Sequence, residues 1–176
     1  STDIEASIFH ALAILGVASP SDKTYAHQKQ AAQILNRVLP QVPEHPGVAH
    51  YLIHSFDYPE LAQLALPAAR VYAKLAPGSP HALHMPSHIF TRLGLWDESI
   101  ASNLASAEKA HRYVENVLPG AVSFDELHAI DYLVYAYLQQ DQDEQARKLV
   151  EQTARVKKID NANFAAAFAI GAVPAR

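Results

Sequence analysis

The chain has 176 residues, of which 49% are hydrophobic and 18% charged, and its formal net charge is −4 at pH 7. This length and composition predict one folded domain with a real core and exclude a disordered chain. There is no basic stripe, which argues against nucleic acid as a partner, and no apolar run approaches the ~18 residues that a membrane-spanning helix needs. Cysteine is absent while histidine occurs ten times, so any metal would have to be bound by nitrogen and oxygen atoms.

The start of the sequence carries no recognisable signal peptide. It begins at Ser1 rather than at Met, which favours a processed form or a piece of something longer. We therefore expect residues 1–176 to form a single helical repeat domain that is a fragment of a longer solenoid.

The first half of the chain predicts two helical hairpins. Apolar residues recur at helical spacing, and proline-rich or glycine-containing turns separate the periodic segments. Ser21 and Asp22 are candidate N-caps for the second helix, and Pro59 suits the first position of the fourth. The expected helices span residues 3–17, 22–39, 47–57 and 59–76.

The second half predicts two further pairs and a terminal segment. Pro86 lies inside the fifth helix, where it removes one backbone hydrogen bond and should bend the helix. Residues 114–122 form an insertion, and Ser123 or Asp125 can cap the helix that follows. The expected helices span residues 81–93, 97–113, 124–140 and 141–156, with a last segment over 164–173 capped by residues 161–163.

A repeat of 34 residues runs through the middle of the chain. The pattern P-x-x-P-x-x-x-H-x-x-x-H-x-F begins at Pro43 and again at Pro77, which places His50 in register with His84 and His54 in register with His88. Stacked supersecondary units produce such fixed periods, and 34 residues is the period of a tetratricopeptide helix pair.

The stretch RLGLWDESIASNLASAEKA, residues 92–110, resembles the turn and second helix of a tetratricopeptide repeat. Gly94 and Trp96 take the turn glycine and aromatic positions, and Ser99 takes the small-residue position. QQDQDEQARKL, residues 139–149, is a weaker match. The resemblance implies an all-α, right-handed α-solenoid of about four tetratricopeptide-like helix pairs.

HPGVAHYLIHSFD and PHALHMPSHIFTRLGLW resemble a group of bacterial tetratricopeptide-repeat proteins with paired histidine motifs (HxxxH and HxxHMPSHI) and no assigned activity. A later helix of these relatives often carries HNxH, whereas this chain has His128 and Asp131 in the matching stretch. The relatives are often exported, so the resemblance implies a periplasmic location, although the composition itself also fits the cytoplasm.

Histidines recur on the first helices of successive pairs at spacings of three and four residues, which places each set on one helical face. In tetratricopeptide repeats these helices line the concave groove, and axes of neighbouring helices lie ~8–10 Å apart, so imidazoles from two helices can meet around a single ion. Imidazole suits zinc, copper, iron or nickel, and added carboxylates favour zinc or iron over Cu(I). The predicted ligands are His50, His54, His84 and His88, with His81, His128 and Asp131 as additional candidates.

Three functions remain open at this point. The first is a binding scaffold that holds a peptide, a partner protein or a small molecule in its groove, with histidines as polar or pH-sensitive contacts. The second is a protein that captures or stores a metal ion in the same groove. The third is a metalloenzyme, a hydrolase or an oxidoreductase, in which Asp57, Asp131 or Tyr135 would be the base or proton donor for a metal-bound water. Neither HxxxH pair contains the glutamate of the HExxH protease motif.

The last segment, FAAAFAIGAV, is apolar on all sides. The terminal helix of a solenoid needs a polar outer face. We therefore expect further repeats or a second subunit to cover this segment.

Overall fold

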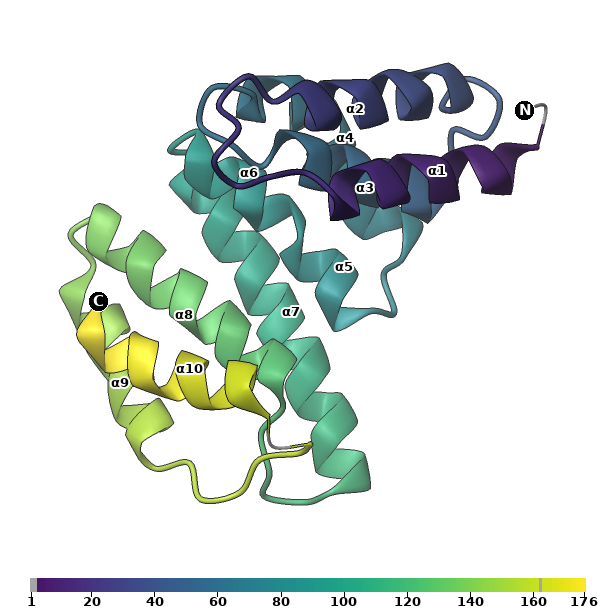
Figure 1. The fold of residues 1–176 in the computed structure, drawn as a ribbon. Coiled ribbons are helices and arrows are strands. Elements are labelled where there is room, and N and C mark those ends of the chain that lie inside the picture. The colour runs from purple at the N-terminus through teal and green to yellow at the C-terminus, as the bar shows by residue number, and fades with distance from the viewer. Residues whose placement is uncertain (1–2, 162) are drawn as a thin grey trace.

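The computed structural model describes residues 3–161 and 163–176, and this part of the chain is a stack of α-helices packed in pairs (Figure 1). The pairs are α1 with α2, α3 with α4, the short α5 and α6 with the long α7, and α8 with α9. The predicted all-α solenoid of about four helix pairs is confirmed. None of the described helices is long and apolar enough to cross a membrane.

The first two pairs lie together at the top of Figure 1. Their main hydrophobic core runs from Ile8 in α1 to Phe90 in α6, so it continues from one pair into the next. This continuity is what a solenoid requires, because each pair buries its apolar face against its neighbours. The helices are α1 Ile4–Gly16, α2 Ala26–Val38, α3 Pro46–Phe56 and α4 Ala62–Leu75.

The third pair occupies the middle of the stack, where α7 runs diagonally through Figure 1. Its first member is divided into two short helices, of which α6 packs against α4 and α7. The helices are α5 Pro80–His84, α6 Pro86–Arg92 and α7 Trp96–Val117.

The C-terminal part consists of α8, α9 and a last helix that packs against α8. Smaller clusters of buried side chains surround α8 and join it to α9 and to the last helix. The helices are α8 Phe124–Gln139, α9 Asp143–Ala154 and α10 Phe164–Ala172, followed by the 3-10 turn Val173–Ala175.

Side-chain caps start several of these helices where the sequence predicts them. Ser123 Oγ accepts a hydrogen bond from the amide of Glu126 at 3.2 Å, which makes it the N-cap of α8 in preference to Asp125. Asn163 caps α10 through the amide of Ala166. Each cap satisfies a backbone donor that the first turn of a helix leaves unpaired. Ala162, in the cap expected at 161–163, lies outside the described residues.

Two helices, α2 and α4, start three or four residues later than predicted. The Asp22 carboxylate accepts hydrogen bonds from both the amide and the hydroxyl of Thr24, which forms a local turn instead of a helix cap. Tyr25 then adopts φ 55°, and α2 begins at Ala26. The predicted start at Pro59 is likewise replaced by a turn through Leu61. Short polar side chains can bond their own backbone and so compete with helix formation.

The predicted bend at Pro86 is a one-residue interruption between α5 and α6. Met85 keeps helical dihedral angles, φ −51° and ψ −36°, and its amide still bonds to the carbonyl of His81 at 2.9 Å. Pro86 occupies the first position of α6, where its missing N–H costs nothing. Residues on both sides of the interruption therefore stay on neighbouring turns.

Gly94 ends this region in a tight turn with φ +69°. Side chains other than glycine are strained at such an angle. The turn lets the chain reverse from α6 into α7, as the tetratricopeptide resemblance implies.

Candidate functional site

Six histidines line up on the first helices of three successive pairs. His50 and His54 lie on α3, His81 and His84 on α5, His88 on α6 and His128 on α8. Intervals of three and four residues bring the side chains of each helix to one face. The structure divides the six into two groups of three, each with ligand nitrogens within 4.8 Å of one another.

The first group, which we call the exposed triad, consists of His50, His54 and His81. Nε2 of His50 lies 3.0 Å from Nε2 of His54 and 3.1 Å from Nε2 of His81. The His50 ring is half-buried and stacks on the Tyr72 ring, whereas the other two imidazoles are exposed. The triad joins the second helix pair to the third.

The second group, the buried triad, consists of His84, His88 and His128. Nε2 of His84 lies 3.0 Å from Nε2 of His88, and the His128 ring packs on the His84 ring at 4.4 Å between centroids. His84 is only 3% exposed. This triad joins the third pair to the fourth.

Two hydrogen bonds orient the rings of the buried triad. The Asn103 side-chain amide donates to the Ser99 carbonyl at 2.8 Å, so its oxygen must face Nδ1 of His84, which lies 2.6 Å away. Nδ1 of His84 is therefore the protonated nitrogen. Nδ1 of His88 lies 2.9 Å from a carboxylate oxygen of Asp57 and is protonated for the same reason.

These tautomers leave an electron pair on Nε2 of both rings. In a neutral imidazole one nitrogen donates and the other accepts. When both rings are neutral, the two Nε2 atoms of His84 and His88 thus face each other at 3.0 Å with no hydrogen between them. A cation placed between them would convert a repulsive contact into two bonds. Zinc–nitrogen bonds of ~2.0–2.1 Å in a tetrahedral site put ligand nitrogens roughly 3.3 Å apart, close to this separation.

Burial favours the neutral, ligating form of His50, His84 and His128. Desolvation lowers the pKa of His84 well below 6.5, and the neighbouring His88 and His128 lower it further. Desolvation likewise lowers the pKa of His128 to about 4 and that of His50 to about 3. A metal ion would therefore meet little competition from protons at neutral pH.

The two carboxylates considered as bases are both held in ion pairs. The Asp57 carboxylate bonds to His88 and, at 3.0 Å, to Nε of Arg92, and these contacts lower its pKa against the opposing effect of burial. The Asp131 carboxylate accepts two hydrogen bonds from Arg176, each of 2.7 Å. Neither triad includes Asp131. Both carboxylates are therefore already paired with basic side chains.

A different tyrosine from the one singled out in the sequence contacts the buried triad. The Tyr132 ring lies 4.8–5.2 Å from all three imidazoles, and its hydroxyl is 3.3 Å from Nδ1 of His88. Burial, with the nearby Asp57 charge, raises the pKa of Tyr132 to about 12, so the phenol stays protonated. Tyr135 instead packs edge-on against Trp96 and under Arg176.

Two cavities adjoin the buried triad. One of about 300 Å³ is lined by charged and aromatic side chains: His88, Thr91, Arg92, Asp131, Tyr132, Tyr135 and Arg176. The other, of about 330 Å³, is apolar and lies between α8 and α10, where Phe124, Phe164 and Phe168 surround His128. Both are large enough for a small molecule or a side chain of a partner.

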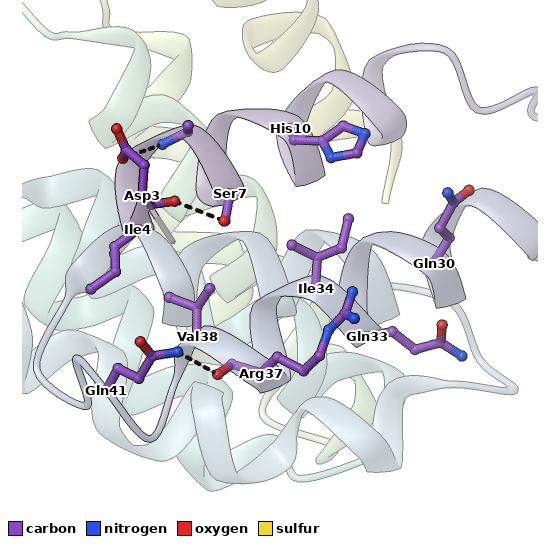
Figure 2. A pocket seen from close by; sticks show the side chains of 11 residues that line it. Asp3, Ile4, Ser7, His10, Gln30, Gln33, Ile34, Arg37, Val38 and Gln41 are labelled. Atoms are coloured by element: carbon purple, nitrogen blue, oxygen red, sulfur yellow. Dashed lines mark hydrogen bonds between the residues drawn. The ribbon is translucent and has the colours of Figure 1, made fainter. Parts of the chain in front are cut away.

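A larger hollow of about 630 Å³ lies elsewhere, between α1 and α2 (Figure 2). Its lining is largely polar, contains the exposed side chains of His10, Gln30 and Arg37, and includes none of the triad histidines. This hollow contains no cluster of metal-ligating side chains among its lining residues, so we do not treat it as a functional site.

Sequence reasoning missed the residues that support the rings. Asn103 lies on α7, outside the repeated histidine pattern, and only the fold brings it to His84. Arg92 and Tyr132 each follow a triad histidine by four residues, so the helical face rule could have found them.

Comparisons with known proteins give information on the fold alone. The sequence matches no protein-family model and no curated protein. Among solved structures, one described as "MamA MSR-1 C2", a tetratricopeptide-like protein, is similar to this chain with a TM-score of 0.52 at 18% sequence identity. The similarity covers 85% of this chain and 95% of that one. The tetratricopeptide-type architecture is thereby supported by shape as well as by repeat period.

Proposed function

We propose that this chain is a tetratricopeptide-type binding scaffold whose buried triad holds a divalent transition metal. The observation that carries the proposal is the pair of opposed Nε2 atoms on His84 and His88, 3.0 Å apart, with both Nδ1 hydrogens already donated. No arrangement of two neutral imidazoles satisfies both nitrogens; a bound metal ion does, as would a proton that turns His88 into an imidazolium paired with Asp57.

The donor set favours zinc or a similar borderline metal. Three imidazoles with no thiolate suit Zn²⁺, Cu²⁺, Ni²⁺ or Fe²⁺ rather than Mg²⁺ or Ca²⁺, which prefer oxygen. The Asp57 carboxylate behind His88 is the arrangement that orients metal-bound histidines and raises their basicity. His50 and His54, predicted with His84 and His88 as one ligand set, belong to the separate exposed triad.

The metal would have a structural role, as a cross-link between two helix pairs. Its ligands come from α5 and α6 on one side and from α8 on the other, so the ion would lock two successive helix pairs at a fixed angle. A binding surface held rigid loses less conformational entropy when a partner docks. We infer that the partner is a peptide, a protein segment or a small molecule bound along the histidine-bearing helices.

Elemental analysis of untagged protein, purified without chelator or added metal, tests the metal. We expect at least one equivalent of a transition metal, and loss of the ion from the buried triad in His84→Ala, with the helical circular dichroism retained. His10→Ala removes an exposed histidine outside both triads and is the matched control. Metal at trace level in the wild-type chain after zinc reconstitution would refute the proposal.

A further inference from the structure

The exposed triad is a second cluster that a single metal site leaves unexplained. His50, His54 and His81 meet at the junction of α3 and α5, and His50 lies in the middle, with Nε2 at 3.0 Å and 3.1 Å from the other two. A neutral imidazole nitrogen offers either one hydrogen or one electron pair. It can therefore satisfy one of these two neighbours well, but not both.

The surroundings of the two triads differ in a way that matters for coordination. The buried triad has its rings fixed by Asn103 and Asp57 and covered by Tyr132. For the exposed triad, the described residues supply no hydrogen bond to any Nδ1 atom, and two of its three rings face solvent. An ion held there would have flexible ligands and an accessible side.

We propose that the exposed triad is a second metal centre, which holds its ion through three imidazoles and keeps an open coordination position for an imidazole from a bound partner. Both triads offer three imidazoles, but Tyr132 covers the buried one. An accessible fourth position beside three protein ligands is the arrangement of reactive zinc sites. A histidine-bearing peptide or an imidazole compound has the donor chemistry that completes such a shell. The inference deepens the scaffold function proposed above, because it names the group by which a partner would be held.

The two centres would therefore differ in exchange. The buried ion is covered by Tyr132 and should be retained, whereas the exposed ion should be lost readily to a chelator and take up added ligands.

Titration of the metal-free chain with Co²⁺ tests the inference, because the visible absorption of Co²⁺ reports both stoichiometry and coordination. We expect two equivalents in the wild type, and one in each of two variants: His81→Ala, which leaves the buried triad, and His128→Ala, which leaves the exposed one. Both side chains lie outside the main core, so both variants should fold.

Added imidazole separates the two centres. It should change the Co²⁺ spectrum of His128→Ala, in which only the exposed centre remains, and leave that of His81→Ala unchanged. A histidine-containing peptide should act like free imidazole in His128→Ala, and its His-to-Ala counterpart should not.

The outcomes distinguish the two proposals. One equivalent in the wild type that His81→Ala leaves intact would overturn the second centre and keep the buried one. Two equivalents with no response to imidazole in His128→Ala would overturn the open position. Loss of binding in His81→Ala with full binding in His128→Ala would instead remove the buried centre and keep the exposed one.

Discussion

Asn103 and Asp57 decide which nitrogen of each ring is available in the buried triad. Asn103 is itself fixed by the Ser99 carbonyl, so its oxygen cannot turn away from His84. Asp57 is held by Arg92 on one side and bonds to His88 on the other. The chemistry of the site thus depends on two side chains that do not belong to the triad.

The first prediction concerns Asp57→Asn. The amide cannot supply the negative charge that orients His88 and raises its basicity, so metal affinity at the buried triad should fall about 10- to 100-fold. Competition with a chromophoric zinc chelator measures the change. The control is Glu98→Gln. It removes a carboxylate on α7 that forms a surface ion pair with Arg70 on α4, and it should leave the metal affinity unchanged. Equal affinities for Asp57→Asn and the wild type would show that the carboxylate has no role at the metal.

A second residue-scale prediction concerns Glu126 on α8. Its side chain is only 4% exposed, one of its oxygens lies 3.4 Å from Nδ1 of His111, and the other has no partner among the described residues. Burial raises its pKa above 4.5. The folded state therefore binds a proton more tightly than the unfolded state, and this stabilisation, present below pH ~4.5, is lost as the pH rises through the folded pKa.

It follows that Glu126→Gln should be more stable than the wild type at pH 7, by about 1 kcal/mol, because a neutral amide avoids the cost of a buried charge. The difference should vanish at pH values below 4.5, where the wild-type carboxyl is also protonated. Urea denaturation at several pH values measures it. A wild type that is the more stable protein at pH 7 would mean that the His111 contact outweighs burial.

At the scale of helices, most elements could be predicted from the sequence. The start of α2 was predicted wrongly because local side-chain hydrogen bonds compete there with helix formation. The repeat period, the turn at Gly94 and the caps of α8 and α10 follow from spacing and residue type alone. Asp22 and Pro59 were misjudged as helix starts because a capping residue and a turn residue look alike without the fold. The division of the histidines into two triads also needed the structure, since spacing fixes a face but not the distance to the next helix.

Phe90 on α6 illustrates a residue that the repeat pattern marks for packing rather than chemistry. It is 5% exposed and belongs to the main core. Phe90→Ala should lower the free energy of unfolding by about 3–5 kcal/mol through lost burial and a cavity. Metal stoichiometry under native conditions should remain that of the wild type, which elemental analysis can check. A loss of metal without a loss of stability would contradict this division of roles.

The terminal helix α10 buries one of its apolar faces and leaves another exposed. Ala166 and Ala169 are buried against α8, while Phe164 and Phe168 are 86% and 63% exposed. Helix packing accounts for one face only. A further repeat or a second subunit over the other face stays a prediction, because exposed aromatic rings alone do not identify what covers them.

On the scale of the whole molecule, the buried histidines should make the metal-free chain sensitive to acid. His50, His84 and His128 have a pKa below 6.5, so the unfolded chain binds more protons than the folded one in the range below pH 6.5. Stability should therefore fall as the pH decreases from about 6.5 towards 4, by roughly 1.4 kcal/mol for each unit by which a pKa is lowered.

Thermal unfolding in the presence of a chelator, at pH 7 and at pH 5, measures this effect. A variant with both His50 and His128 replaced by Gln should lose less stability between the two pH values than the wild type. Identical pH profiles would mean that these two imidazoles titrate alike in the folded and unfolded chains.

Metal loading should act in the opposite direction. An ion that binds only the folded chain adds about 2.7 kcal/mol of stability when its free concentration is 100 times the dissociation constant. The melting temperature should therefore rise with zinc in the wild type and rise less in His84→Ala. A melting temperature independent of zinc would indicate that no ion prefers the folded state.

The two triads lie at different joints of the stack, one between the second and third helix pairs and the other between the third and fourth. Any change in the curvature of the solenoid must alter the separation of nitrogens across these joints. Metal occupancy and curvature are then thermodynamically reciprocal: an ion that favours one curvature is in turn held more tightly by whatever imposes that curvature. A partner that bends the chain would thereby regulate its metal content without touching a single histidine.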